Sequence, residues 1–246
     1  MTDGAVISEI FSSIQGEGML VGCRQIFIRF SGCNLQCRFC DTRQETPPTH
    51  CRCEAAPGTN KFDLLPNPLS VDQVVRRVER LEPSRHQAVS LTGGEPLLHV
   101  PFLKQLIPLL PATRRGIYLE TNGTLPAELE QIIDFVDMVA MDIKLPGTAG
   151  AGPFWEEHHH FLALAVRKNV QVKIIVDDDS AEGEVERALD LIRRVGDIPV
   201  VFQPVTAPGG YPQLSPRRAL FMQARAMAKL SDVRVIPQTH RFIQVP

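Results

Sequence analysis

The amino-acid sequence predicts an α/β fold, a partial (incomplete) TIM-type β/α barrel of about six to seven parallel strands. From about Val71 onward, short apolar runs rich in β-branched residues alternate with stretches of helical periodicity, the pattern of consecutive βα units. Polar motifs follow these runs at their carboxyl ends, where parallel β/α barrels place their chemistry. Since no change in composition marks a second domain, we expect residues 1–246 to form one domain.

The elements follow from these patterns in chain order. The predicted strands are Gln25–Phe30, Ala88–Thr92, Gly116–Glu120, Asp137–Ile143, Val170–Val176, Ile198–Gln203 and Val233–Pro237. The predicted helices lie near residues 71–81, 101–110, 126–135, 156–168, 182–195 and 215–229. Ser70 and Ser215 occupy N-cap positions, and Pro216 suits a first helical turn. The proline-rich region at about 43–69 is expected to be an irregular surface insertion.

The charge balance argues against two classes of partner. Lysines and arginines number 26 against 28 acidic residues, so the net charge is −2. This gives no electrostatic reason to expect a nucleic acid or an anionic membrane as partner. No apolar run reaches the roughly 20 residues of a membrane span. Without a visible export signal, we expect a cytoplasmic protein with reduced thiols.

Three clustered cysteines are the strongest chemical signal in the sequence. Cys33, Cys37 and Cys40 have the spacing C-x3-C-x2-C directly after the first predicted strand. Three thiolates on one compact loop suit a [4Fe–4S] cluster that leaves one iron open. Together with the other polar motifs at strand ends, they favour an enzyme over a structural module.

Zinc is the alternative metal that this loop could bind. A structural zinc site normally has four protein ligands, so Cys51, Cys53 or a histidine would have to complete it. Cys51 and Cys53 with Cys23 supply only three further thiols, and we expect a disordered loop or an adventitious metal site around Cys51 and Cys53.

The cysteine loop resembles the signature of the radical S-adenosylmethionine superfamily. "TGGEP" (Thr92–Pro96), one βα unit later, resembles the second motif of that superfamily. The resemblance implies that S-adenosylmethionine binds the open iron and that its reductive cleavage gives a hydrogen-abstracting 5′-deoxyadenosyl radical. The cofactor then carries the difficult chemistry, and the protein places it.

Three further stretches resemble one family within that superfamily. "SIQGEG" (Ser13–Gly18), "RFSGCNLQCRFCDT" (Arg29–Thr42) and "QTHRFIQVP" (Gln238–Pro246) are similar to 7-carboxy-7-deazaguanine synthases. The resemblance implies a carbon–nitrogen lyase that contracts 6-carboxy-5,6,7,8-tetrahydropterin to 7-carboxy-7-deazaguanine with release of ammonia, in queuosine and 7-deazapurine biosynthesis. It also implies Mg²⁺, a homodimer and an electron donor of the flavodoxin or ferredoxin type.

The same resemblance assigns site residues. Thr42 matches the Mg²⁺ ligand. The residues assigned to the substrate are Ile14, Gln15, Gly16, Glu17, Arg29, Thr92, His240 and Pro246, the last through its terminal carboxylate. Those assigned to S-adenosylmethionine are Phe39, Cys40, Asp41, Gly94, Glu95, Asn122, Asp142, Ile143, Lys144, Gln203, Pro204, Val205 and Thr206. A planar guanidinium such as that of Arg29 suits a substrate carboxylate.

One motif departs from the family pattern. Where the family commonly reads Ser-Pro-Lys, this chain has Asp142-Ile143-Lys144, which is familiar from glycyl-radical-enzyme activases. Such an activase is therefore the second function considered, and a non-catalytic zinc-bound scaffold is the third. Lys173 lies in a buried strand run, so it should pair with a carboxylate or meet the cofactor. His158–His160 are expected on a solvated helix face.

Overall fold

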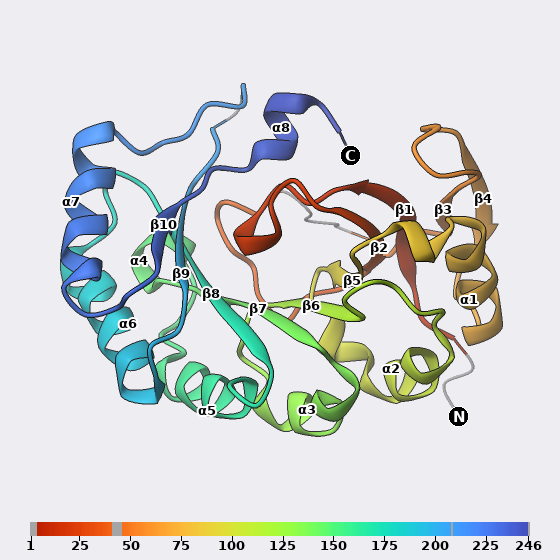
Figure 1. The fold of residues 1–246 in the computed structure, drawn as a ribbon, viewed down its shortest axis with the longest axis horizontal. Coiled ribbons are helices and arrows are strands. Elements are labelled where there is room, and N and C mark those ends of the chain that lie inside the picture. The colour runs from red at the N-terminus through yellow and green to blue at the C-terminus, as the bar shows by residue number, and fades with distance from the viewer. Residues whose placement is uncertain (1–3, 41–45, 208, 246) are drawn as a thin grey trace.

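The computed structural model describes residues 4–40, 46–207 and 209–245. Their strands form one ten-stranded sheet in the order β10-β9-β8-β7-β6-β5-β2-β1-β3-β4 (Figure 1). The strands are β1 (Ile7–Ile14), β2 (Arg24–Phe30), β3 (His50–Glu54), β4 (Phe62–Pro66), β5 (Ala88–Gly93), β6 (Ile117–Thr121), β7 (Met138–Ile143), β8 (Asn169–Val176), β9 (Val200–Pro204) and β10 (Val233–Val235). The run from β2 through β5 to β10 is parallel throughout, which confirms the predicted partial barrel.

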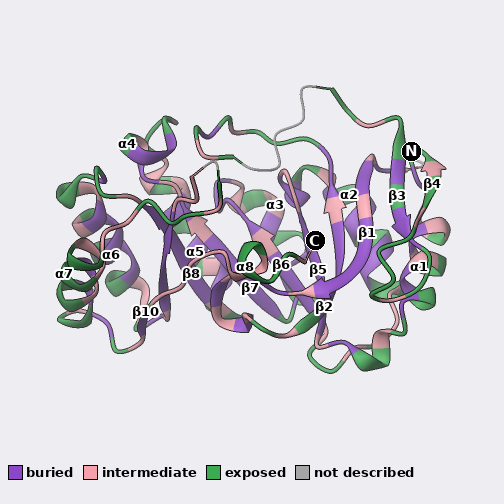
Figure 2. Ribbon diagram, turned by 90° about the horizontal axis from the view of Figure 1, so that it is seen from above, coloured by how far each residue is buried: buried purple, intermediate pink, exposed green. Residues whose placement is uncertain are grey.

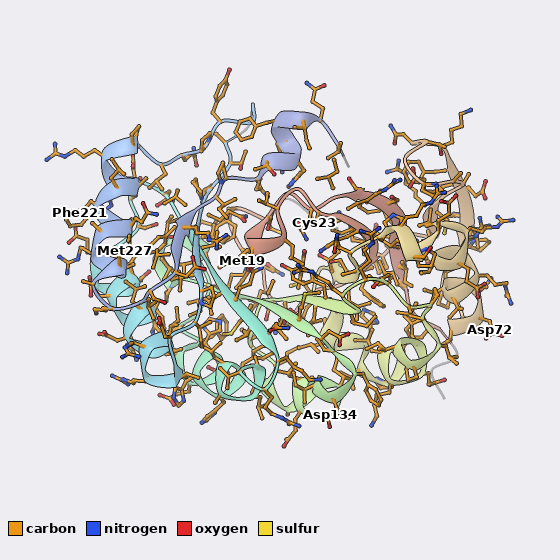
Figure 3. The ribbon with its side chains drawn as sticks, viewed as in Figure 1. Met19, Cys23, Asp72, Asp134, Phe221 and Met227 are labelled. Carbon is orange, nitrogen blue, oxygen red and sulfur yellow. The ribbon has the colours of Figure 1, made fainter. Side chains whose placement is uncertain are left out.

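Most helices cover the convex side of the curved sheet, whereas α8 (Thr239–Ile243) lies above its concave side (Figure 1). The helices are α1 (Val71–Arg80), α2 (Val100–Leu106), α3 (Pro126–Glu130), α4 (Pro146–Ala149), α5 (Trp155–Ala165), α6 (Glu182–Val195), α7 (Pro216–Met227) and α8 (Thr239–Ile243), with short 3₁₀ turns η1 (Gly18–Leu20), η2 (Pro83–Arg85), η3 (Pro96–His99), η4 (Ile107–Leu109) and η5 (Ile133–Phe135). Ser70 caps α1 through the Gln73 amide, and Ser215 caps α7 through the Arg218 amide, as the sequence predicts. Asp72 and Asp134 lie on the outside of this layer (Figure 3).

The two faces of the parallel sheet differ in polarity, and this difference creates the site. On the convex face, side chains such as Val89, Leu119 and Ile174 belong to the main hydrophobic core under the helices. Strands of parallel sheets are usually apolar on both faces because both are covered. Here the alternate positions carry polar residues, among them Thr92 and Lys173, which are also buried. Figure 2 shows that the central strands of the sheet are mostly buried. The concave face of the sheet is therefore polar, and it lines the inside of the partial barrel.

Two regions differ from the expectation of a simple βα series. The strand β1 pairs antiparallel with β2, and the region expected to be irregular contains the antiparallel hairpin of β3 and β4. Cys51 and Cys53 are fully buried on β3, where they pack in the main core. The expectation of a disordered or metal-binding loop at these cysteines is wrong, because their alternation directs both side chains to the apolar face of the hairpin.

No helix in the described part of the chain is long and apolar enough to cross a membrane.

Candidate active site

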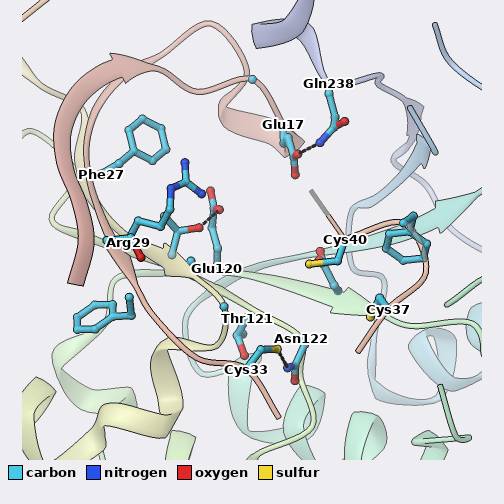
Figure 4. A pocket seen from close by; sticks show the side chains of 18 of the residues that line it. Glu17, Phe27, Arg29, Cys33, Cys37, Cys40, Glu120, Thr121, Asn122 and Gln238 are labelled. Carbon is cyan, nitrogen blue, oxygen red and sulfur yellow. Dashed lines mark hydrogen bonds between the residues drawn. The ribbon is translucent and has the colours of Figure 1, made fainter. Parts of the chain in front are cut away.

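One cavity of about 1060 Å³ opens on the concave side of the sheet, at the carboxyl ends of the parallel strands. Its walls come from the loop after β1, the cysteine loop, strand ends and the C-terminal segment (Figure 4). Most of the residues that the sequence assigns to a site line it: Ile14, Gln15, Gly16, Glu17, Arg29, Cys33, Cys37, Phe39, Cys40, Thr92, Gly94, Asn122, Asp142, Lys144, Gln203, Pro204, Val205, Thr206 and His240. Glu95 and Ile143 are buried behind this lining. Asp41, Thr42 and Pro246 lie outside the described residues.

The three cysteines of the loop after β2 share this cavity. Burial raises the pKa of the Cys33 and Cys37 thiols, so a bound metal would have to displace their protons. The Asn122 amide nitrogen lies 3.8 Å from the Cys33 sulfur. The Lys144 ammonium lies 5.4 Å from the centre of the Phe39 ring, which brings a positive charge to the loop.

The arrangement of the thiol donors distinguishes a cluster from a zinc ion. No three histidine, cysteine, aspartate or glutamate side chains among the residues described converge on a single ion. A cubane cluster binds each thiolate through a different iron, so its ligands surround a shared space and do not meet at one point. The loop cysteines line such a space, whereas Cys51 and Cys53 lie in the core with their sulfurs 3.5 Å apart. The donors therefore fit a [4Fe–4S] cluster.

The glycine motif after β5 is joined to the cysteine loop through the backbone. The amide of Gly94 donates to the Phe30 carbonyl at 3.1 Å, and that of Glu95 donates to the Gly32 carbonyl at 2.8 Å. A Cβ atom on Gly94 would collide with the Gly32 carbonyl oxygen. Only glycine allows this approach.

Glu95 holds the neighbouring strand end and does not line the cavity. Its carboxylate accepts hydrogen bonds from the Thr121 hydroxyl at 2.9 Å and from the backbone amide of Asn122 at 2.8 Å. Burial raises the pKa of Glu95 to about 7. In this structure Glu95 positions the Thr121–Asn122 turn beside the cysteine loop.

His158 supports the same turn from the outside, and the expectation that it is solvated is wrong. It is fully buried on α5, and its Nε2 lies 3.2 Å from the Asn122 carbonyl oxygen. Burial lowers the pKa of His158 to about 4, so the ring is neutral. Of the three consecutive histidines, only His160 is exposed.

A row of alternating charges crosses the cavity floor. The Asp142 carboxylate lies 2.9 Å from the Lys144 ammonium and 3.3 Å from the Lys173 ammonium. Lys173 also donates to the Glu17 carboxylate. Burial alone would lower the pKa of Lys173, but the surrounding carboxylates raise it well above its usual value. Lys173 therefore pairs with carboxylates, one of the two alternatives that the sequence left open.

Glu120 is a cavity residue that sequence reasoning missed. Its carboxylate accepts hydrogen bonds from the Gln15 amide at 2.5 Å and from the Thr92 hydroxyl at 2.7 Å. Burial raises the pKa of Glu120. The signal was present, because an acidic residue interrupts an otherwise apolar strand run at an inward position.

Arg29 lies at one end of the cavity, near Phe27 and Glu120 (Figure 4). Its Nε lies 3.2 Å from Glu9, and Glu9 also accepts a hydrogen bond of 2.6 Å from Arg52. Two guanidinium groups thus share one carboxylate. The excess positive charge suits an anionic group of a ligand.

The C-terminal segment, which begins at Gln238, forms another wall of the cavity, beside the loop after β1. The Thr239 amide donates to the Gly16 carbonyl at 2.9 Å, and the Gln238 side chain donates to Glu17 at 2.8 Å. His240 packs against Gly16, where a Cβ atom would collide with its ring. Both ends of the chain thus contribute to one site.

Comparisons with known proteins agree with this geometry. The Radical SAM superfamily model matches residues 27–205. The 7-carboxy-7-deazaguanine synthase of Geobacter sulfurreducens is 45% identical over 98% of this chain and 97% of its own length. That of Methanothermobacter thermautotrophicus is 34% identical over 97% of each chain. The crystal structure of QueE from Escherichia coli superposes with a TM-score of 0.57 and 20% identity, covering 96% of this chain and 95% of that one, which shows a common fold.

Proposed function

Because the chain belongs to the radical S-adenosylmethionine superfamily and, within it, to the 7-carboxy-7-deazaguanine synthase family, we propose that its cavity binds 6-carboxy-5,6,7,8-tetrahydropterin and contracts it to 7-carboxy-7-deazaguanine with release of ammonia. The observation that carries this proposal is the joining of two sets of residues in one cavity. Loop thiols that fit a cluster line the same space as a polar set suited to a flat, nitrogen-rich carboxylic acid.

The cysteine loop and the neighbouring strand ends are assigned to the cofactor end of the cavity. Cys33, Cys37 and Cys40 would hold the cluster, and the cluster with S-adenosylmethionine supplies the radical that takes hydrogen from the substrate. Gly94 allows the close approach of the Gly32 carbonyl, which keeps the glycine motif against the cysteine loop. Lys144 and Gln203 line the same cavity.

The substrate end of the cavity is assigned to Arg29, Gln15 and Glu120, which would bind the pterin. A pterin offers N–H and amino donors along one edge, and a carboxylate such as that of Glu120 accepts two parallel donors. Gln15 contacts Glu120 in the structure and extends this edge. Arg29 faces the cavity and would bind the substrate carboxylate with its planar fork.

Mg²⁺, the electron donor and the dimer belong to the same proposal. Thr42, two positions after Cys40, is proposed as a Mg²⁺ ligand, with substrate oxygens and waters completing the shell. The donor is proposed to be a flavodoxin or ferredoxin. Homodimer formation is supported by three apolar side chains on α7 that are exposed by more than 40%, Leu220, Phe221 and Met227. Phe221 and Met227 are labelled in Figure 3. The six free cysteines are consistent with a reducing cytoplasm.

The structure offers less support for the other two functions. The motif that suggested an activase has a local role here, because Asp142 pairs with Lys144 and Lys173. The zinc scaffold needs a fourth ligand, and Cys51 and Cys53 lie in the hydrophobic core.

Anaerobic turnover tests the proposal. The reconstituted protein receives reductant, S-adenosylmethionine, Mg²⁺ and carboxytetrahydropterin, and the product is identified by mass. The expected result is 7-carboxy-7-deazaguanine and ammonia in equal amounts, with S-adenosylmethionine largely regenerated. Cleavage of S-adenosylmethionine with unchanged pterin would contradict the proposal and favour an activase.

A further inference from the structure

The Glu17 carboxylate joins three distant parts of the chain. Glu17 follows β1, Lys173 lies in β8, and Gln238 begins the C-terminal segment. One carboxylate oxygen accepts from the Lys173 ammonium, and the other accepts from the Gln238 amide at 2.8 Å (Figure 4). A single side chain thus links the floor of the cavity to its C-terminal wall.

Gly16 adds a second attachment at the same place. Its carbonyl oxygen accepts from the Thr239 amide at 2.9 Å and from the Thr239 hydroxyl at 3.1 Å. His240, which follows Thr239, packs on Gly16. Two consecutive residues of the loop therefore hold three consecutive residues of the segment.

The C-terminal segment contributes little burial of its own. α8 has five residues and none of them is buried. Phe242 and Ile243 are both more than half exposed. A helix of this length is not stable in isolation, so its position depends on contacts with the rest of the chain.

Lys173 fixes the orientation and the charge of Glu17. The ammonium of Lys173 is held from the other side by Asp142 at 3.3 Å. Burial alone would raise the pKa of Glu17, but Lys173, Gln238 and His240 together outweigh it and lower the pKa to about 2. Gln238 therefore donates to a permanent, fixed anion, and hydrogen bonds to charged acceptors are the stronger class.

We propose that Glu17, held by Lys173, and Gln238 are positioning residues that dock the C-terminal segment over the substrate end of the cavity. Docking at these contacts places His240 and Arg241 in the lining of the cavity. None of the positioning residues needs to take part in the chemistry. This inference rests on the proposed function for the identity of the substrate, but the docking itself does not.

Limited trypsin digestion measures the docking without turnover. Cleavage after Arg241 releases residues 242–246, and intact mass reports the rate at which the shortened chain appears. Proteolysis follows the population of the locally opened state. Loss of a hydrogen bond to a charged group in Gln238→Ala is expected to speed this cleavage by about tenfold or more. Gln131→Ala, at an exposed position after α3, is the matched control and should keep the wild-type rate.

A second variant separates two contacts of Gln238. The Gln238 side chain also accepts from Arg241 at 3.1 Å, so its removal could act through Arg241 alone. Glu17→Gln removes the anion and leaves the contact between Gln238 and Arg241 in place. It should speed cleavage in the same direction by a smaller factor.

Turnover kinetics complete the test. In Gln238→Ala the KM for the pterin should rise about tenfold, with kcat within about twofold and S-adenosylmethionine affinity unchanged. The inference is overturned if either variant is cleaved at the wild-type rate, or if the KM of Gln238→Ala does not change. If the wild-type protein does not convert the pterin, the proposed function fails, and the digestion rates still decide whether Glu17 docks the segment.

Discussion

Asp142 and Lys173 are register partners on β7 and β8, and their charged atoms lie 3.3 Å apart on the cavity floor. Glu17 contacts the same ammonium. Lys173 is thus a buried cation that two carboxylates compensate, and removal of a partner from a buried pair leaves an uncompensated charge.

Lys173→Met should therefore reduce the free energy of unfolding by about 3–5 kcal/mol. The double variant Glu17→Gln, Lys173→Met should recover part of this loss, because it removes the charge of Glu17, whereas Asp142 keeps Lys144 as its partner. Urea unfolding at pH 7 measures both, with the exposed Lys104→Met as control. A double variant less stable than Lys173→Met alone would contradict the pairing.

Glu17 also gives the stability a defined pH dependence. Its pKa is about 2 in the folded chain against 4.5 for an ordinary glutamate, so ionisation favours the folded state. This contribution, about 3 kcal/mol, is complete above pH 4.5 and is lost as the pH falls towards 2. The difference in unfolding free energy between wild type and Glu17→Gln should fall to about half between pH 6 and pH 3. A difference that is constant over this range would rule out the low pKa.

The parallel strands and the motifs at their ends were predictable from the sequence. A parallel strand such as β8 has a continuous apolar signal, and a motif that follows it must lie at the carboxyl edge of the sheet. Cys33, Gly94 and Asn122 each follow a different strand and meet at one cavity for this reason.

The contacts between distant segments were not predictable in the same way. Glu17 and Gln238 are separated by 221 positions, and no local pattern relates them. The strand β1 alternates weakly, and its place between the antiparallel partner β2 and the parallel partner β3 depends on pairings that no local pattern shows. Cys51 and Cys53 read as metal ligands in sequence because their burial in the hairpin depends on tertiary packing.

Glu120→Gln should weaken substrate binding and spare the cofactor chemistry. A neutral amide presents one acceptor oxygen in place of two, so the KM for the pterin should rise about 10- to 100-fold. Reductive cleavage of S-adenosylmethionine without pterin should continue at the wild-type rate. Steady-state kinetics with the exposed Glu130→Gln as control measure the effect. An unchanged KM would remove Glu120 from the substrate site.

Arg29→Lys and Arg52→Lys separate the two guanidinium groups around Glu9. Both side chains line the cavity, but that of Arg29 is 24% exposed and that of Arg52 is 53% exposed. Loss of the planar fork at Arg29 should raise the KM for the pterin by about tenfold or more. The same change at Arg52 should have an effect of about twofold or less, because exposed ion pairs contribute little. Equal effects would show that Arg29 has no special part in carboxylate binding.

The electron paramagnetic resonance spectrum of the reduced, anaerobically reconstituted protein is the most direct test of the three-thiolate site. With one iron open, addition of S-adenosylmethionine is expected to change the spectrum of a sample that contains about four iron and four sulfide per chain. Cys37→Ala, measured in parallel, should bind little iron and give no such change. A fully loaded wild-type sample whose spectrum does not respond to S-adenosylmethionine would contradict the proposed site.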